Sequence, residues 1–258
     1  MKANGDVNGT AVGLDSAVRV CLFDLDGVLT QTAKIHAQAW KSSFDAFLRD
    51  YDMHNQRRDA PFDEGSDYEQ FVDGKTREDG VRSFLASRGI KVPEGDPNDE
   101  PGTQTVYGIG ATKQKAFLAL LEKHGPQVFD GSVRYVRAAR AAGLGCAVVT
   151  SSANCDAILE AAGIADLFDA TVDGHDVAVQ GLRGKPAPDS YLAGAKALGV
   201  GPGNAAVFED ALAGVESGRA GDFVEVVGVD RIGGDHPQHL REHGATVVVQ
   251  DLSELLPR

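Results

Sequence analysis

The chain has 258 residues and an ordinary apolar content, enough to bury a substantial core in one large domain or two linked ones. Its net charge of −13 argues against nucleic acids and anionic membrane surfaces as partners. No apolar run is long enough to span a membrane, and the polar start of the chain is unlike a signal peptide. The spacing of Cys21, Cys146 and Cys155 is unlike that of metal ligands, so we expect them to be buried free thiols. Because free thiols suggest a reducing compartment, we also expect a cytoplasmic protein.

The most informative stretch of the sequence begins at residue 18, after a short polar segment. Residues 1–17 are rich in Gly and Asn, and we predict that they form a disordered lead-in. The apolar run 18–23 then predicts a buried strand that stops at an Asp-Leu-Asp-Gly sequence. Asp24 and Asp26 share one face of this strand end, where open α/β sheets bind ligands. Taken alone, the four residues also fit an ordinary strand followed by an Asx-type turn.

Helical periodicity dominates the segment that follows the first strand. Amphipathic patterns predict helices at 33–48, 77–88 and 112–124. Residues 92–105 are rich in Pro, Gly and acids, which is typical of a surface loop. Because residues 32–122 contain no convincing strand, we predict that they form an inserted α-helical cap domain.

Strands and helices alternate in the remainder of the chain. Apolar runs predict strands at 144–149, 169–172, 205–208, 223–229 and 245–249. Amphipathic segments predict helices at 133–142, 156–162, 190–198, 212–219 and 237–243. Such alternation predicts an α/β fold, a Rossmann-like doubly wound parallel sheet. We assign residues 18–31 and 123–258 to this core domain.

Polar residues follow the second strand of the core. Thr150, Ser151, Ser152 and Asn154 lie between a predicted strand and a predicted helix. Hydroxyl and amide groups at that position suit a bound phosphate. They also suit a simple helix cap, which the sequence alone favours.

Two further segments place charged residues at loop positions of the core. Lys185 precedes a proline in a Gly-Lys-Pro sequence, so it is either rigidly presented or a solvated loop lysine. Glu209 and Asp210 end the strand that begins at residue 205, and they could be solvated or could hold Mg²⁺.

These motifs together resemble a known superfamily. The sequence FDLDGVLT at 23–30, followed in order by the three later motifs, resembles the haloacid dehalogenase (HAD) superfamily of phosphotransferases. The continuation TAKIHAQAWK at 32–41 resembles its β-phosphoglucomutase branch. The resemblance implies a phosphorylated sugar as substrate, a glucose bisphosphate intermediate and Mg²⁺ as cofactor.

The resemblance also implies the chemical roles of the core residues. Asp24 would be the nucleophile that becomes an aspartyl phosphate, and Asp26 the general acid and base. Thr150 and Lys185 would bind the transferring phosphoryl group. The metal ligands implied are Asp24, the backbone carbonyl of Asp26 and Asp210, with Glu209 as a ligand or the partner of a ligand.

The cap would supply specificity for the substrate. Arg77 in DGKTRED matches a residue that grips the non-transferring phosphate, although it could instead form a surface ion pair with Glu78 and Asp79. His36 matches a histidine near the hinge, although a helical histidine can equally face solvent. The substrate-binding residues implied by the resemblance are Thr32, His36, Trp40, Arg77, Lys113, Ser151, Ser152 and Asn154.

Three functions remain open from the sequence. The leading hypothesis is a monomeric β-phosphoglucomutase that interconverts β-D-glucose 1-phosphate and glucose 6-phosphate. The alternative is a sugar-phosphate phosphatase, which differs in whether water or a sugar hydroxyl reaches the aspartyl phosphate. A non-catalytic scaffold is disfavoured because it would not need Asp24, Asp26, Lys185 and Asp210 together.

Overall fold

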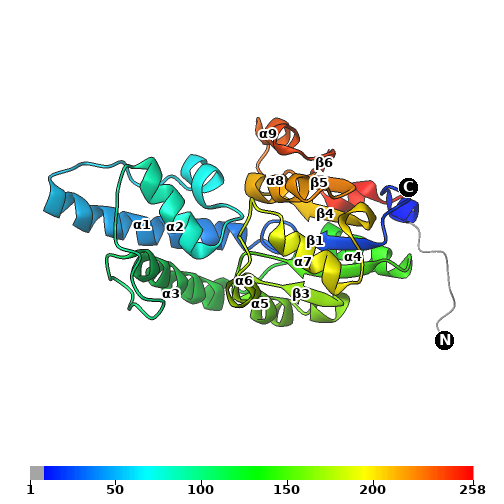
Figure 1. The fold of residues 1–258 in the computed structure, drawn as a ribbon, viewed down its shortest axis with the longest axis horizontal. Helices are drawn as coiled ribbons and strands as arrows, with labels where there is room; N and C mark the ends of the chain where they lie inside the picture. The colour runs from blue at the N-terminus through cyan, green and yellow to red at the C-terminus, as the bar shows by residue number, and fades with distance from the viewer. Residues whose placement is uncertain (1–8, 258) are drawn as a thin grey trace. The chain divides into compact units, whose positions relative to one another are not determined.

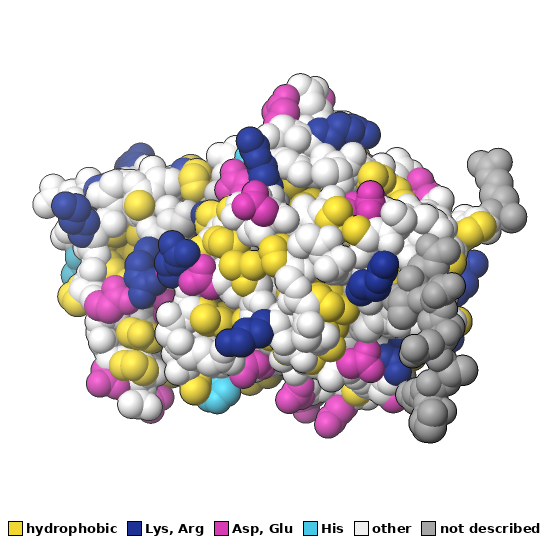
Figure 2. Space-filling view, turned by 45° about the vertical axis from the view of Figure 1, so that its right-hand side comes forward, with side chains coloured by type: hydrophobic (Ala, Val, Ile, Leu, Met, Phe, Trp, Pro, Cys, Tyr) yellow, Lys and Arg dark blue, Asp and Glu magenta, His cyan; other side chains and the backbone are white. Residues whose placement is uncertain are grey.

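The computed structural model describes residues 9–257. The chain forms two compact units, one made of the residues up to Gln31 and from Pro126 onward, the other of Thr32–Gly125 (Figure 1). No helix among the described residues is long and apolar enough to cross a membrane. Figure 2 shows one face of the molecule, on which Lys and Arg side chains are interspersed with Asp and Glu side chains.

The first unit is built on a six-stranded sheet of order β3-β2-β1-β4-β5-β6, and every neighbouring pair is parallel. This arrangement confirms the predicted doubly wound α/β fold. The direction of strand order reverses between β1 and β4, which is where open α/β sheets bind their ligands. The strands are β1 (Val20–Phe23), β2 (Gly145–Val149), β3 (Ala170–Val172), β4 (Ala205–Glu209), β5 (Glu225–Val229) and β6 (Val247–Val249).

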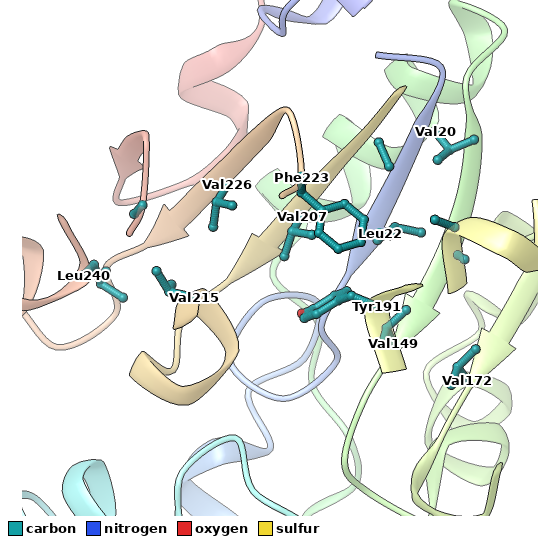
Figure 3. Packing of buried hydrophobic residues seen from close by; sticks show 14 residues of the cluster. Val20, Leu22, Val149, Val172, Tyr191, Val207, Val215, Phe223, Val226 and Leu240 are labelled. Carbon is teal, nitrogen blue, oxygen red and sulfur yellow. The ribbon is translucent and has the colours of Figure 1, made fainter. Parts of the chain in front are cut away.

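Helices cover both faces of this sheet because successive strand residues point to opposite sides. Leu22 and Val207 pack on one face with residues of α7, α8 and α9 (Figure 3). On the other face the rings of Phe23 and Phe208 stack 4.5 Å apart, and Tyr135 of α4 packs against Phe208. The helices are α4 (Asp130–Ala141), α5 (Cys155–Ala161), α6 (Gly174–Gln180), α7 (Asp189–Ala197), α8 (Leu212–Ala220) and α9 (His236–His243).

Short 3-10 helices complete this unit, namely η1 (Gly9–Val12), η3 (Ala165–Leu167), η4 (Pro202–Asn204) and η5 (Leu252–Leu255). Cys21, Cys146 and Cys155 are buried and free, as the sequence predicted. The helix α6 was not predicted, because its seven residues are too few to show a helical period. It is defined instead by a capping box in which Asp173 and Asp176 each accept the other's backbone N–H.

The predicted disordered lead-in is wrong for residues 9–17, while residues 1–8 lie outside the described part of the chain. Val12 and Leu14 are buried in the first unit. Tyr135 donates its hydroxyl to the carbonyl of Val12 at 3.0 Å, and the backbone N–H of Asp15 donates to Glu225 at 2.8 Å. The segment is polar overall, but burial of its apolar side chains Val12 and Leu14 is enough to hold it against the first unit.

The regular elements of the second unit are all helices, and none of its residues forms a strand of the sheet. Its elements are α1 (Ala33–Asn55), a π-helix η2 (Tyr68–Val72), α2 (Arg77–Ser87) and α3 (Val106–His124). Stacked and tilted rings form its core, with Trp40, Phe44, Phe62 and Phe84 in contact. The helix α3 begins six residues before its predicted start because Thr105 caps it, accepting the N–H of Gly108.

Candidate active site

The central strands bring the core motifs to one edge of the sheet. Phe23 pairs in register with Val148 on β2 and with Phe208 on β4. The next residue, Asp24, is therefore level with Glu209, and its backbone N–H donates to the carbonyl of Phe208 at 2.9 Å. The acids at the ends of β1 and β4 consequently face one space beyond the strand ends.

Lys185 lies at the centre of this group and is fully buried. Its Nζ donates to Asp24 Oδ1 and to Glu209 Oε1, both at 2.6 Å, and to the carbonyl of Val149 at 3.2 Å. Burial alone would lower the pKa of Lys185, but the two carboxylates raise it above its ordinary value. The side chain is thus a buried ammonium ion, and the alternative of a solvated loop lysine is wrong.

A tyrosine that the sequence analysis did not single out completes this arrangement. The ring of Tyr191 lies in the apolar cluster beside Leu22 and Val149 (Figure 3), with Lys185 Nζ 4.8 Å from its centre. Its hydroxyl donates to Glu209 Oε1 at 3.0 Å. The sequence signal that could have pointed to Tyr191 is its place on the buried face of a predicted helix, because a buried tyrosine hydroxyl needs a hydrogen-bond acceptor.

Three carboxylates gather beside Lys185. Oxygen atoms of Asp24, Glu209 and Asp210 lie within 4.8 Å of one another, and all three residues are buried. Burial raises the pKa of Asp24 well above its ordinary value, Lys185 lowers it, and the charges of Glu209 and Asp26 raise it further. With Asp24 ionised, three carboxylates against one ammonium leave an excess of negative charge, and a divalent cation would balance it. The group is therefore a candidate metal site.

The oxygens of Glu209 are already engaged within this group. Oε1 accepts hydrogen bonds from Lys185 and Tyr191, while Oε2 accepts the backbone N–H of Ala211 at 3.0 Å. Gly214 permits this position, because a Cβ there would overlap the carboxylate of Glu209. The geometry favours Glu209 as the residue that holds Lys185 in place.

The turn after β1 depends on a glycine. Gly27 has φ +89°, and a Cβ on it would overlap the carboxylate of Asp210. Its N–H donates to the carbonyl of Thr30 at 2.7 Å, and the Thr30 hydroxyl donates to the carbonyl of Leu25 at 3.1 Å. This compact turn leaves Asp26 half-buried at the edge of the sheet.

The loop after β2 is held by its own hydroxyl groups. Thr150 is buried, and its Oγ1 accepts the N–H of Ser152 at 3.1 Å. Ser152 Oγ in turn accepts the N–H of Asn154 at 3.3 Å, and Ser151 precedes it in the same turn. The Asn154 side chain makes no capping hydrogen bond to α5. The simple helix-cap explanation therefore does not hold for Asn154.

Within the second unit, three of the predicted substrate-binding residues form one cluster. Lys113 is buried, with its Nζ 2.7 Å from His36 Nδ1 and 5.1 Å from the ring centre of Trp40. The His36 ring packs on Phe117 at 4.1 Å, so the histidine does not simply face solvent. Thr32 is buried immediately before α1.

Arg77 lies at the start of α2 in the same unit. Its Nε pairs with Glu78 at 3.0 Å, as the surface ion-pair alternative expected. Its Nη1 also donates to Gln114 Oε1 at 3.3 Å. The Arg77 side chain also lies beside Gly110 of α3, so Arg77 and Gln114 share one region of the unit.

Comparisons with known proteins agree with this geometry. A family model described as a haloacid dehalogenase-like hydrolase matches residues 18–222. A beta-phosphoglucomutase of Mycobacterium tuberculosis is 52% identical over 252 residues, which cover 97% of this chain and 96% of that protein.

Two solved structures show the same fold. A beta-phosphoglucomutase from Clostridium difficile has a TM-score of 0.70 at 23% identity, covering 92% of this chain and 93% of that chain. CbbY from Rhodobacter sphaeroides, solved with xylulose-(1,5)bisphosphate, has a TM-score of 0.67 at 23% identity, covering 92% and 96%.

Proposed function

The chain belongs to the haloacid dehalogenase-like hydrolase family, and we propose that it is a β-phosphoglucomutase. The observation that carries the proposal is the 52% identity to the mycobacterial enzyme over nearly the whole of both chains. The reaction would interconvert β-D-glucose 1-phosphate and glucose 6-phosphate through a glucose bisphosphate. The partner is then a phosphorylated sugar, and we propose a monomer acting in the cytoplasm.

The core residues support phosphoryl transfer through Asp24. In its phosphorylated form, Asp24 would carry the phosphoryl group as an aspartyl phosphate. Asp26 would take the proton from the sugar 6-hydroxyl as that oxygen attacks phosphorus, which releases the Asp24 carboxylate and yields the bisphosphate. After the bisphosphate reorients, Asp24 would attack the 1-phosphate, and Asp26 would return its proton to the leaving sugar oxygen. Lys185 and Thr150 would bind the transferring oxygens.

The donor set fits Mg²⁺, which prefers oxygen ligands. Asp24, Asp210 and the backbone carbonyl of Asp26 would hold the ion, and the engaged oxygens of Glu209 support a role in orienting Lys185. When bound, Mg²⁺ would offset the negative charge of the phosphoryl oxygens and of the acids. The excess of buried carboxylates supports this assignment.

A mutase must also bind the second phosphate of its intermediate. We assign this role to Arg77 and Lys113 of the cap. Arg77 offers a bidentate guanidinium, and Lys113 a buried ammonium. His36 and Trp40 pack beside Lys113 and would position it.

The second candidate is a sugar-phosphate phosphatase, favoured by the hydrolase description of the family. Phosphorus-31 NMR separates the two functions. The protein is incubated with β-D-glucose 1-phosphate, Mg²⁺ and a trace of glucose bisphosphate. Glucose 6-phosphate as the main product supports the mutase, whereas inorganic phosphate as the main product would contradict it.

A further inference from the structure

An arginine beyond β5 holds the turn that follows the first strand. Arg231 donates its Nε–H to the carbonyl of Gly27 at 2.8 Å and an Nη2–H to the carbonyl of Val28 at 3.2 Å. Its Nη1 donates to the carbonyl of Gln250 at 2.7 Å, and its guanidinium lies 3.6 Å from the ring centre of Phe129. One rigid, planar side chain therefore fixes two consecutive carbonyls of the turn.

A histidine of the same segment holds the end of β4. His236 is buried, and its Nε2 donates to the backbone carbonyl of Asp210 at 3.1 Å. Its Nδ1 lies 2.9 Å from the carboxylate of Asp230, which also accepts the backbone N–H groups of Ile232 and Gly233. Asp230 thus holds the imidazole at Nδ1, while Nε2 contacts the backbone carbonyl of Asp210.

Each of these two contacts fixes a backbone carbonyl that belongs either to Asp210 or to the glycine beside its carboxylate. The α-carbon of Gly27 abuts that carboxylate so closely that a Cβ would overlap it. Arg231 fixes the carbonyl of Gly27, and His236 fixes the carbonyl of Asp210 itself. A shift of either carbonyl would displace the carboxylate or enlarge the space in which it lies.

We propose that residues 230–236, which we name the β5–α9 brace, set the position of the Asp210 carboxylate for the metal ion. Arg231 and His236 are positioning residues in this proposal, acting through Gly27 and the Asp210 backbone. The proposal rests on the metal site of the proposed function, and it adds that metal affinity depends on residues that do not touch the ion. Groups that orient metal ligands typically change affinity by about 10–100-fold when they are replaced.

Two substitutions of His236 provide a matched test. In His236→Gln the side-chain amide reaches the position of Nε2 and can still donate to the carbonyl of Asp210. In His236→Asn the amide reaches only the position of Nδ1, so the carbonyl of Asp210 loses its donor. Mg²⁺ binding is measured by isothermal titration calorimetry without sugar phosphate, and unfolding is followed in EDTA.

We expect His236→Asn to raise the Mg²⁺ dissociation constant by about 10-fold or more, and His236→Gln to stay close to wild type. Equal affinity in both variants, or equal loss in both, would overturn the proposal. Because no substrate is present, this result is independent of whether the protein forms glucose 6-phosphate or inorganic phosphate.

Arg231→Met tests the other contact, with Arg140→Met as its control. Arg140 also donates to a backbone carbonyl, that of Leu167 at the end of η3, at 3.0 Å, but from the last turn of α4. We expect a weaker Mg²⁺ affinity only in Arg231→Met, by about 10-fold or more. If both variants lose the same stability in EDTA but bind Mg²⁺ as wild type does, Arg231 only stabilises the fold, and the proposed role of the β5–α9 brace is refuted.

Discussion

Replacing Lys185 by methionine tests the buried charge group on which the active site depends. The side chain keeps its approximate length, but Asp24 and Glu209 each lose an ammonium partner at 2.6 Å. Removing one partner of a buried ion pair typically destabilises a protein by about 3–5 kcal/mol. We therefore expect the free energy of unfolding in EDTA to fall by about that amount.

The same substitution should slow phosphoryl transfer. Lys185 would face the transferring oxygens, and losing about 3–4 kcal/mol of charge stabilisation in the transition state corresponds to about 10²–10³-fold in rate. The assays are urea denaturation in EDTA and the rate of glucose 6-phosphate formation at saturating Mg²⁺.

Lys196→Met is the matched control, because Lys196 is an exposed lysine on α7, the helix that carries Tyr191. It should leave both quantities close to wild type. Should Lys185→Met match this control in stability and in rate, the buried pair would have no energetic role and Lys185 would not be part of the site.

Three further substitutions test separate parts of the assignment. Asp24→Asn should reduce turnover at least ~10³-fold while the circular dichroism spectrum is unchanged, and retention of a tenth of the activity would exclude Asp24 as the nucleophile. Arg77→Ala should reduce mutase flux by ~10²-fold or more but spare hydrolysis of acetyl phosphate, which has no second phosphate; equal losses on both substrates would contradict a distal grip. Burial raises the pKa of Glu225 in the native state, so its contribution is full below the unfolded pKa and is lost as pH rises through the native pKa. Glu225→Gln cannot ionise, so its unfolding midpoint should rise relative to that of wild type as the pH increases above the ordinary glutamate pKa; a difference independent of pH would refute this.

The alternation of strands and helices and the position of Asp24 at a strand end were predictable because both are local properties of the sequence. A run of strand-forming residues that stops at Asp24 and Asp26 places the acids at a strand end. The family resemblance then gave roles to Lys185, Glu209 and Asp210, because a fixed motif order carries information that a single motif does not.

Local patterns and motif order do not reveal contacts between segments that are far apart in the sequence. Lys185 and Asp24 are 161 positions apart, and whether a loop lysine is solvated or buried depends on which strands become neighbours. Tyr191, Arg231 and His236 reach the site only once β4 has paired with β1 and β5 has paired with β4.

The sequence by itself determined the alternation of strands and helices, the inserted helical unit and the identity of the acids at the first strand end. Periodicity and local turn chemistry are sufficient for these features. Only the tertiary structure decided that Glu209 is engaged by Lys185 and Tyr191, and that residues 9–17 are ordered. These features depend on burial and on contacts between distant segments, and such contacts exist only once the sheet has formed.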